Sequence, residues 1–166
     1  PERVAALVLV APAVGGATTP QLTGRSAELQ DEVLRCRASG DLDALNHAFA
    51  ALWLDGPFSE IGRVGGAARE LFLDMDALML KHGEVGEALE PAQAAWAQLE
   101  RIAAPAQVVW GDLDLPHLQQ QGQILAQRMP HAQACVLPGV AHLPSLEAPE
   151  AFNAALRGFL SQIERR

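Results

Sequence analysis

The spacing of hydrophobic positions changes twice along the chain. Val4–Ala11 (VAALVLVA) is an apolar run without alternation, which is typical of a strand buried on both faces within a parallel sheet. Pro12 and the glycines that follow it break this run. From about Gln21 to Glu90 the apolar residues recur at helical spacing, and after Pro91 short strand-like and helix-like segments alternate.

Three helices are predicted in the middle of the chain. The first covers Ala27–Arg37, and the second begins after Asp41, a residue type that favours the N-cap position. The second helix is expected to end at Asp55-Gly56-Pro57. A third helix is expected over Ala67–Lys81. One face of this third helix carries the apolar side chains Leu71, Met75, Leu78 and Met79.

The last third of the chain predicts strands connected by helices. Ala106–Trp110 and Ala132–Leu137 have strand patterns, whereas Ala92–Arg101, Pro116–Met129 and Pro149–Ile163 have helical patterns. Such an alternation predicts an α/β fold of three parallel strands with flanking helices. We therefore expect a core made of residues 1–14 and 91–166, interrupted by a helical insertion over residues 15–90.

Composition narrows the classes of function. The chain has 166 residues, 49% of them hydrophobic, and a formal net charge of −8, so we expect neither a nucleic acid nor a membrane as its partner. The longest apolar run, Val4–Val14, is too short to span a bilayer. It follows Pro1-Glu2-Arg3 rather than a start methionine and a basic segment. Cys36 and Cys135 lack metal-type spacing, and we expect a reduced, cytoplasmic chain.

Polar side chains follow two of the predicted strands. Asp112 and Asp114 come directly after the strand that ends at Trp110, and His142 lies five residues past Leu137. Because function gathers at the carboxyl ends of parallel strands, a carboxylate and an imidazole are expected to meet there. In such a pair the carboxylate fixes the imidazole tautomer and stabilises the imidazolium during proton transfer.

Two alternatives involve the same loops. His117, in the first turn of a predicted helix, could compete with His142 as the partner of Asp114. A divalent metal site could also form from Asp112, Asp114, His117 and His142. We consider the metal site the weaker interpretation and expect no metal.

These segments resemble the α/β-hydrolase superfamily. Ala104–Asp114 (APAQVVWGDLD) is similar to that family's acid-bearing strand and loop, and Pro138–Phe152 (PGVAHLPSLEAPEAF) to its histidine loop and final helix. The beginning of the chain, through Pro12, resembles the strand that follows the nucleophile-bearing helix. The resemblance covers roughly residues 1–14 and 91–165, and it implies a partial α/β-hydrolase fold in which the helical insertion corresponds to the family's lid.

The resemblance also implies roles for individual residues. Asp114 matches the catalytic acid and His142 the general base, whereas Asp112 would cap the turn. Glu147 is expected to be structural, as a carboxylate near a helix N-terminus. Ala141 stands where the family usually has glycine.

A nucleophile motif is missing from the sequence. No G-x-S-x-G is present, although a triad hydrolase needs its nucleophile on such a strand-to-helix turn. Gly24–Glu28 lacks the second glycine, and Ser145 lies within the histidine loop. We therefore expect the C-terminal half of a hydrolase, inactive alone. We also expect the apolar Val4–Ala11 strand either to need its missing N-terminal half or to mediate self-association.

The implied activity is hydrolysis of an ester, a lactone or a similar small carbonyl substrate through a covalent intermediate, without a cofactor. The chain has no Tyr, which argues against an epoxide hydrolase. Trp53 leaves a haloalkane dehalogenase possible, and a non-catalytic hydrolase-like binding domain is the other alternative. Substrate-pocket candidates, equally suited to the core of the lid, are Trp53, Phe58, Phe72, Met75 and Met79.

Overall fold

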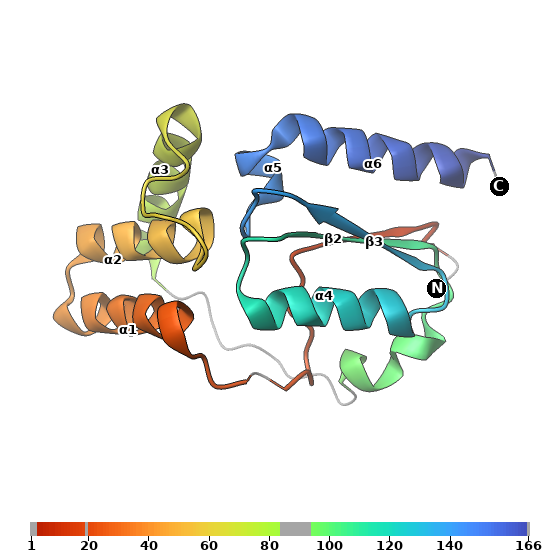
Figure 1. The fold of residues 1–166 in the computed structure, drawn as a ribbon, viewed down its shortest axis with the longest axis horizontal. Helices are drawn as coiled ribbons and strands as arrows, with labels where there is room; N and C mark the ends of the chain where they lie inside the picture. Colours follow the sequence, from red (N-terminus) through yellow and green to blue (C-terminus); the bar gives the residue numbers. More distant parts are fainter. Residues whose placement is uncertain (1–2, 19, 84–93, 166) are drawn as a thin grey trace. The chain divides into compact units, whose positions relative to one another are not determined.

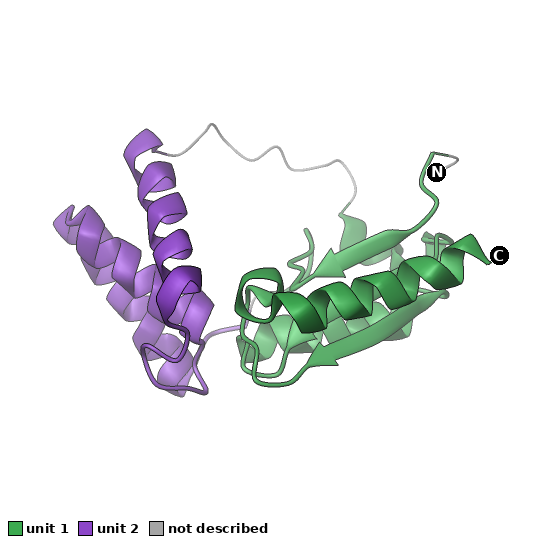
Figure 2. Cartoon of the chain, turned by 90° about the horizontal axis from the view of Figure 1, so that it is seen from above, with its two compact units in different colours: residues 1–19, 90–166 green, residues 20–89 purple. Residues whose placement is uncertain are grey.

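The computed structural model describes residues 3–18, 20–83 and 94–165. The chain divides into two compact units (Figure 2), residues 1–19 with 90–166 and residues 20–89. The predicted junction between residues 90 and 91, and the predicted start of a helix at residue 92, lie outside the described residues.

A sheet of three parallel strands forms the first unit. The strands β1 (Leu7–Val10), β2 (Ala106–Gly111) and β3 (Ala132–Leu137) lie in that order, so β2 is central. The prediction of three parallel strands is therefore confirmed. β1 begins later than the apolar run, and its first bond joins the Leu7 amide to the carbonyl of Pro105 at 2.9 Å.

The first strand is apolar on both faces but incompletely covered in the described residues, as expected for this strand without its missing neighbour. β1 is only partly buried, and Val10 is 37% exposed, whereas every residue of β2 is buried. The physical reason is position: β1 has a neighbour on one side only, and the central strand β2 has neighbours on both sides.

Helices cover both faces of this sheet (Figure 1). One face packs on α4 (Pro116–Arg128) and the short 3₁₀ helix η2 (Ala95–Arg101), and the other on α6 (Pro149–Glu164). The first face contains the buried residues Leu99, Ala106, Val108, Trp110, Leu125 and Met129. The second contains Val109, Leu137 and Val140, with Phe152 of α6 packed against them.

The second unit contains the predicted helices. They are α1 (Gly24–Ser39), α2 (Leu42–Phe49), the π-helix η1 (Ala50–Asp55) that continues α2, and α3 (Gly66–His82). The side chain of Asp41 accepts from the amide of Ala44 at 2.9 Å, so its predicted N-cap is confirmed. Gly56, with a φ of 80° that suits glycine, follows the end of η1.

The third helix exposes its apolar face. None of the α3 residues is buried, and the predicted apolar face is 50–63% exposed at Leu71, Met75, Leu78 and Met79. The spacing of these residues predicted the helix correctly.

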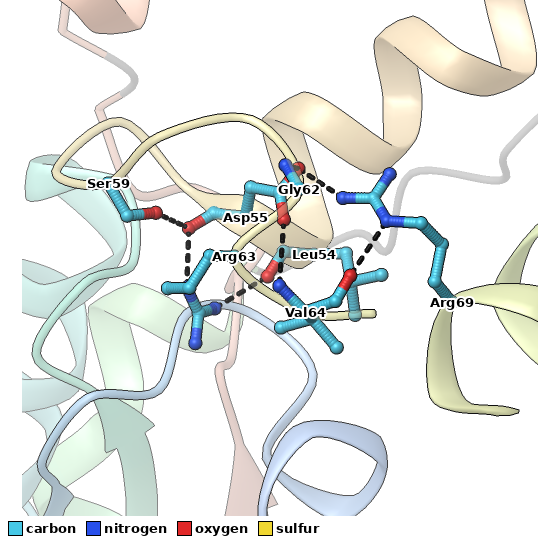
Figure 3. A network of polar contacts seen from close by, with 7 residues as sticks. All are labelled: Leu54, Asp55, Ser59, Gly62, Arg63, Val64 and Arg69. Carbon is cyan, nitrogen blue, oxygen red and sulfur yellow. Dashed lines mark hydrogen bonds and ion pairs between the residues drawn. The ribbon is translucent and has the colours of Figure 1, made fainter. Parts of the chain in front are cut away.

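A polar network holds the loop after η1 (Figure 3). Asp55, which is 1% exposed, accepts from the amides of Gly62 (2.9 Å) and Val64 (3.2 Å). Its carboxylate also pairs with the guanidinium of Arg69, and Nε of Arg63 donates to its carbonyl at 3.1 Å. One buried carboxylate therefore fixes both ends of the turn.

No helix in the described parts of the chain is long and apolar enough to cross a bilayer.

Candidate functional site

The candidate site lies where β2 and β3 end. The loops that follow these strands are joined by their backbones, because Asp112 N donates to Leu137 O (3.2 Å) and Leu113 N to Val140 O (2.9 Å). At Gly111, the last residue of β2, a Cβ atom would lie 1.9 Å from the carbonyl oxygen of Val140. A glycine is therefore required at this position for the loops to meet.

Asp114 and His142 lie in direct contact in this site. The distance from Oδ2 of Asp114 to Nδ1 of His142 is 3.0 Å, so the contact expected from the strand order is present. Asp114 is buried, with a side chain only 1% exposed, and its Oδ1 accepts from the Leu115 amide at 2.7 Å. The side chain of His142 is 24% exposed. A carboxylate that accepts from Nδ1–H selects the tautomer whose Nε2 can take up a proton.

His117 lies near this pair without being hydrogen-bonded to Asp114. Both carboxylate oxygens of Asp114 have other partners, Leu115 and His142. Burial lowers the pKa of His117, with a smaller opposing effect from the Asp114 carboxylate. Its Nδ1 is buried and has no hydrogen-bond partner among the described residues. The alternative in which His117 replaces His142 as the partner of Asp114 is therefore wrong.

Two further carboxylates hold the loop around His142. Oδ1 of Asp112 accepts from the Gly139 amide at 2.7 Å, so this residue ties the two loops together. Glu147 is the last residue of α5 (Pro144–Glu147), a short helix that the sequence pattern did not predict. Its carboxylate accepts from the amides of Ala141 and Leu143, so its expected structural role acts through direct hydrogen bonds rather than through a helix dipole.

The metal alternative does not fit this geometry. Asp112 and Asp114 direct their carboxylates to Gly139 and His142. Over the described residues, no three His, Cys, Asp or Glu side chains gather as a metal site.

The pocket candidates all lie in the second unit. Trp53 and Phe72 are partly buried, whereas Phe58, Met75 and Met79 are 57%, 63% and 57% exposed. A cavity of about 620 Å³ in the same unit is lined by other residues, including Arg25, Arg35, Cys36 and His47. The assignment of the five candidates to a substrate pocket stays a prediction.

Sequence reasoning missed two features of the site. One is Gly111, whose requirement arises from a backbone passing over it in space. The other is the use of both Glu147 oxygens. A glycine at the end of a buried strand, directly before an acidic loop, was the available signal for the first.

Comparisons with known proteins identify the fold of the chain. No family model matches the sequence, and no curated protein shows significant similarity to it. Among solved structures, a hydrolase from Pseudomonas aeruginosa PA01 matches with a TM-score of 0.68 and 24% identity over 95% of this chain and 56% of its own. A thermophilic esterase from Thermogutta terrifontis matches with 0.65 and 20% over 97% of this chain and 57% of its own. Est816, described as an N-acyl homoserine lactone degrading enzyme, matches with 0.59 and 20% over 95% and 58%, respectively.

These similarities show the fold. The chain has the α/β-hydrolase fold and spans a little under three fifths of the length of these solved structures. The partial fold that the sequence predicted is therefore confirmed.

Proposed function

We propose that this chain carries the acid and the base of an α/β-hydrolase that acts on an ester, a lactone or a similar small carbonyl substrate. The observation that carries the proposal is the 3.0 Å contact between buried Asp114 and partly exposed His142 at the ends of adjacent parallel strands. An esterase and a lactone-degrading enzyme among the structural neighbours support the substrate class.

In the proposed mechanism a nucleophile from residues outside these 166 attacks the carbonyl carbon. Nε2 of His142 takes the proton of the nucleophile, and Asp114 stabilises the imidazolium that forms. The imidazolium then gives its proton to the leaving group, and an acyl-enzyme remains. Water, deprotonated by the same imidazole, releases the acid and restores the nucleophile.

The free edge of β1 supports the need for a further chain segment. The amides of Leu7 and Ala11 turn toward β2, so by strand alternation those of Val8 and Val10 turn to the opposite edge. No strand among the described residues pairs with that edge. We infer that it receives the remainder of a hydrolase fold or, without that remainder, a second copy of this chain.

The test is hydrolysis of an activated aryl ester by the native protein that contains this chain. His142→Ala and Asp114→Asn are each expected to lower kcat by about 10⁴-fold, the magnitude known for triad members. His131→Ala, an exposed histidine in a turn, is the matched control. The 166 residues alone are expected to give no turnover above that of free imidazole.

Unchanged kcat in His142→Ala would refute the proposal. A native protein that shows no turnover while its Asp114–His142 contact persists would instead favour the non-catalytic binding domain.

A further inference from the structure

The two carboxylate oxygens of Glu147 are both used by the backbone on either side of His142. Oε2 accepts from the Ala141 amide at 2.7 Å, and Oε1 accepts from the Leu143 amide at 2.8 Å. The turn of α5 places Glu147 next to the loop, because the Glu147 amide donates to the carbonyl of Leu143 at 2.9 Å. One carboxylate thus binds the backbone on both sides of His142.

Only a carboxylate suits this arrangement. Two amide donors converge on one side chain, and a carboxylate offers an acceptor to each, whereas a glutamine amide offers one acceptor and one donor group. The bonds are short, as charge-assisted hydrogen bonds are. The site is also partly withdrawn from water, since Ala141 is 0% exposed and Glu147 is partly buried.

The two halves of the loop are attached by different carboxylates. Asp112 binds the amide of Gly139, and Val140 accepts from Leu113, so the first half of the loop is tied to the end of β2. The second half of the loop, on either side of His142, is tied by the carboxylate of Glu147. Loss of the Glu147 carboxylate would release these two amides and leave the backbone that carries the imidazole less ordered.

We propose that Glu147 is a positioning residue for the acid–base pair: by binding the amides of Ala141 and Leu143 it fixes the imidazole of His142 against Asp114. This role rests on the proposed function, because it matters for catalysis only if His142 is the base. Glu147 acts through the backbone and takes no part in the transfer of protons.

Nuclear magnetic resonance of the native protein that contains this chain tests the proposal without needing activity. The readout is the exchange rate of the Nδ1 proton of His142, together with the ring ¹⁵N shifts that report its tautomer. In the wild type we expect a protected Nδ1 proton. In Glu147→Gln its exchange is expected to be at least tenfold faster, whereas amide protection of Val108 in β2 stays unchanged.

Two further variants sharpen the result. Glu150→Gln changes an exposed glutamate in the first turn of α6 and is expected to behave as wild type. Glu147→Asp keeps the charge on a side chain one methylene shorter, which can reach one amide, so an intermediate exchange rate is expected.

An Nδ1 proton that exchanges at the wild-type rate in Glu147→Gln would overturn the proposal, even if the Ala141 and Leu143 amides became less protected. If Glu147→Gln unfolds the chain, Glu147→Asp decides, and a wild-type rate there overturns the proposal. A wild-type chain without a protected Nδ1 proton would refute the Asp114 contact and with it both proposals. Lack of ester hydrolysis by the native protein, with the expected exchange pattern intact, would refute the proposed function alone.

Discussion

Replacement of Gly111 by alanine is the most demanding test of the way the two loops meet. The added Cβ would lie 1.9 Å from the carbonyl oxygen of Val140 and 2.5 Å from that of Ala141. Ordinary carbon–oxygen contacts begin near 3.3 Å, so the backbone of the histidine loop must retreat by roughly 1.4 Å. That retreat breaks the 2.9 Å bond between Leu113 and Val140 and draws His142 away from Asp114.

The magnitude follows from these contacts. Forced overpacking costs about 1–3 kcal/mol, and each lost hydrogen bond adds about 1 kcal/mol. Gly111→Ala should therefore lower the free energy of unfolding by about 3–5 kcal/mol.

Two other glycines give a graded comparison. At Gly158 in α6 a Cβ meets nothing within 4 Å, so alanine should stabilise by about 0.5–1 kcal/mol.

Gly122 in α4 is the intermediate case. A Cβ there would lie 2.8 Å from Cε3 of Trp110. The ring of Trp110 is buried in the core and must shift, at a cost of about 1–3 kcal/mol, and the gain in helix propensity offsets about 1 kcal/mol of it, so a loss of about 0–2 kcal/mol is expected.

Urea unfolding, followed by tryptophan fluorescence, measures all three variants. With a slope near 2 kcal/mol per molar urea, Gly111→Ala should move the midpoint down by about 1.5–2.5 M. A Gly111→Ala chain within 1 kcal/mol of wild type, with His142 still bonded to Asp114, would show that the loops are not as tightly apposed as described.

Three other predictions concern different parts of the chain. Asp55→Asn should destabilise the second unit by about 3–5 kcal/mol in thermal unfolding, because it leaves the Arg69 guanidinium beside a neutral, buried amide; a loss below 1 kcal/mol would contradict this. Burial raises the pKa of Asp76, so the folded state binds its proton more tightly than the unfolded state does, and stability is lost as pH rises through the folded pKa. Asp76→Asn should therefore be more stable than wild type at pH 7, by less than about 1 kcal/mol since the side chain is partly solvated, and no more stable at pH 3. Finally, light scattering of the isolated chain should show association, and Val10→Lys, at the exposed end of β1, should reduce it; a stable 17.7 kDa monomer would refute that edge as the docking strand.

The sequence predicted those parts of the fold whose patterns are local. β3 was placed at its observed bounds, and α4 and α6 start at the prolines that marked them. The contact between Asp114 and His142 could also be foreseen, because neighbouring parallel strands bring their carboxyl ends together.

Features that depend on tertiary contacts could not be foreseen. α5 is four residues long, too short for a hydrophobic period to be recognised. The π-helical end of α2 leaves no distinct signal in AALWLD. The exposed face of α3 depends on what packs against it. The requirement for Gly111 exists only once Val140 lies over it.

The order of β1 and β2 along the chain has a consequence for folding kinetics. They are adjacent in the sheet, yet roughly 95 residues separate them, and the entropy lost on closing a loop grows with its length. Those residues include the unit of residues 20–89, whose helices contact one another at short sequence separation. Local contacts form faster than distant ones, so we expect the helical unit to fold first. Once compact, it shortens the loop that must close before β1 reaches β2. Stopped-flow refolding should then show helix formation ahead of sheet formation. Substitutions that weaken the helical unit should also slow the formation of the sheet, although that unit contributes no strand to it.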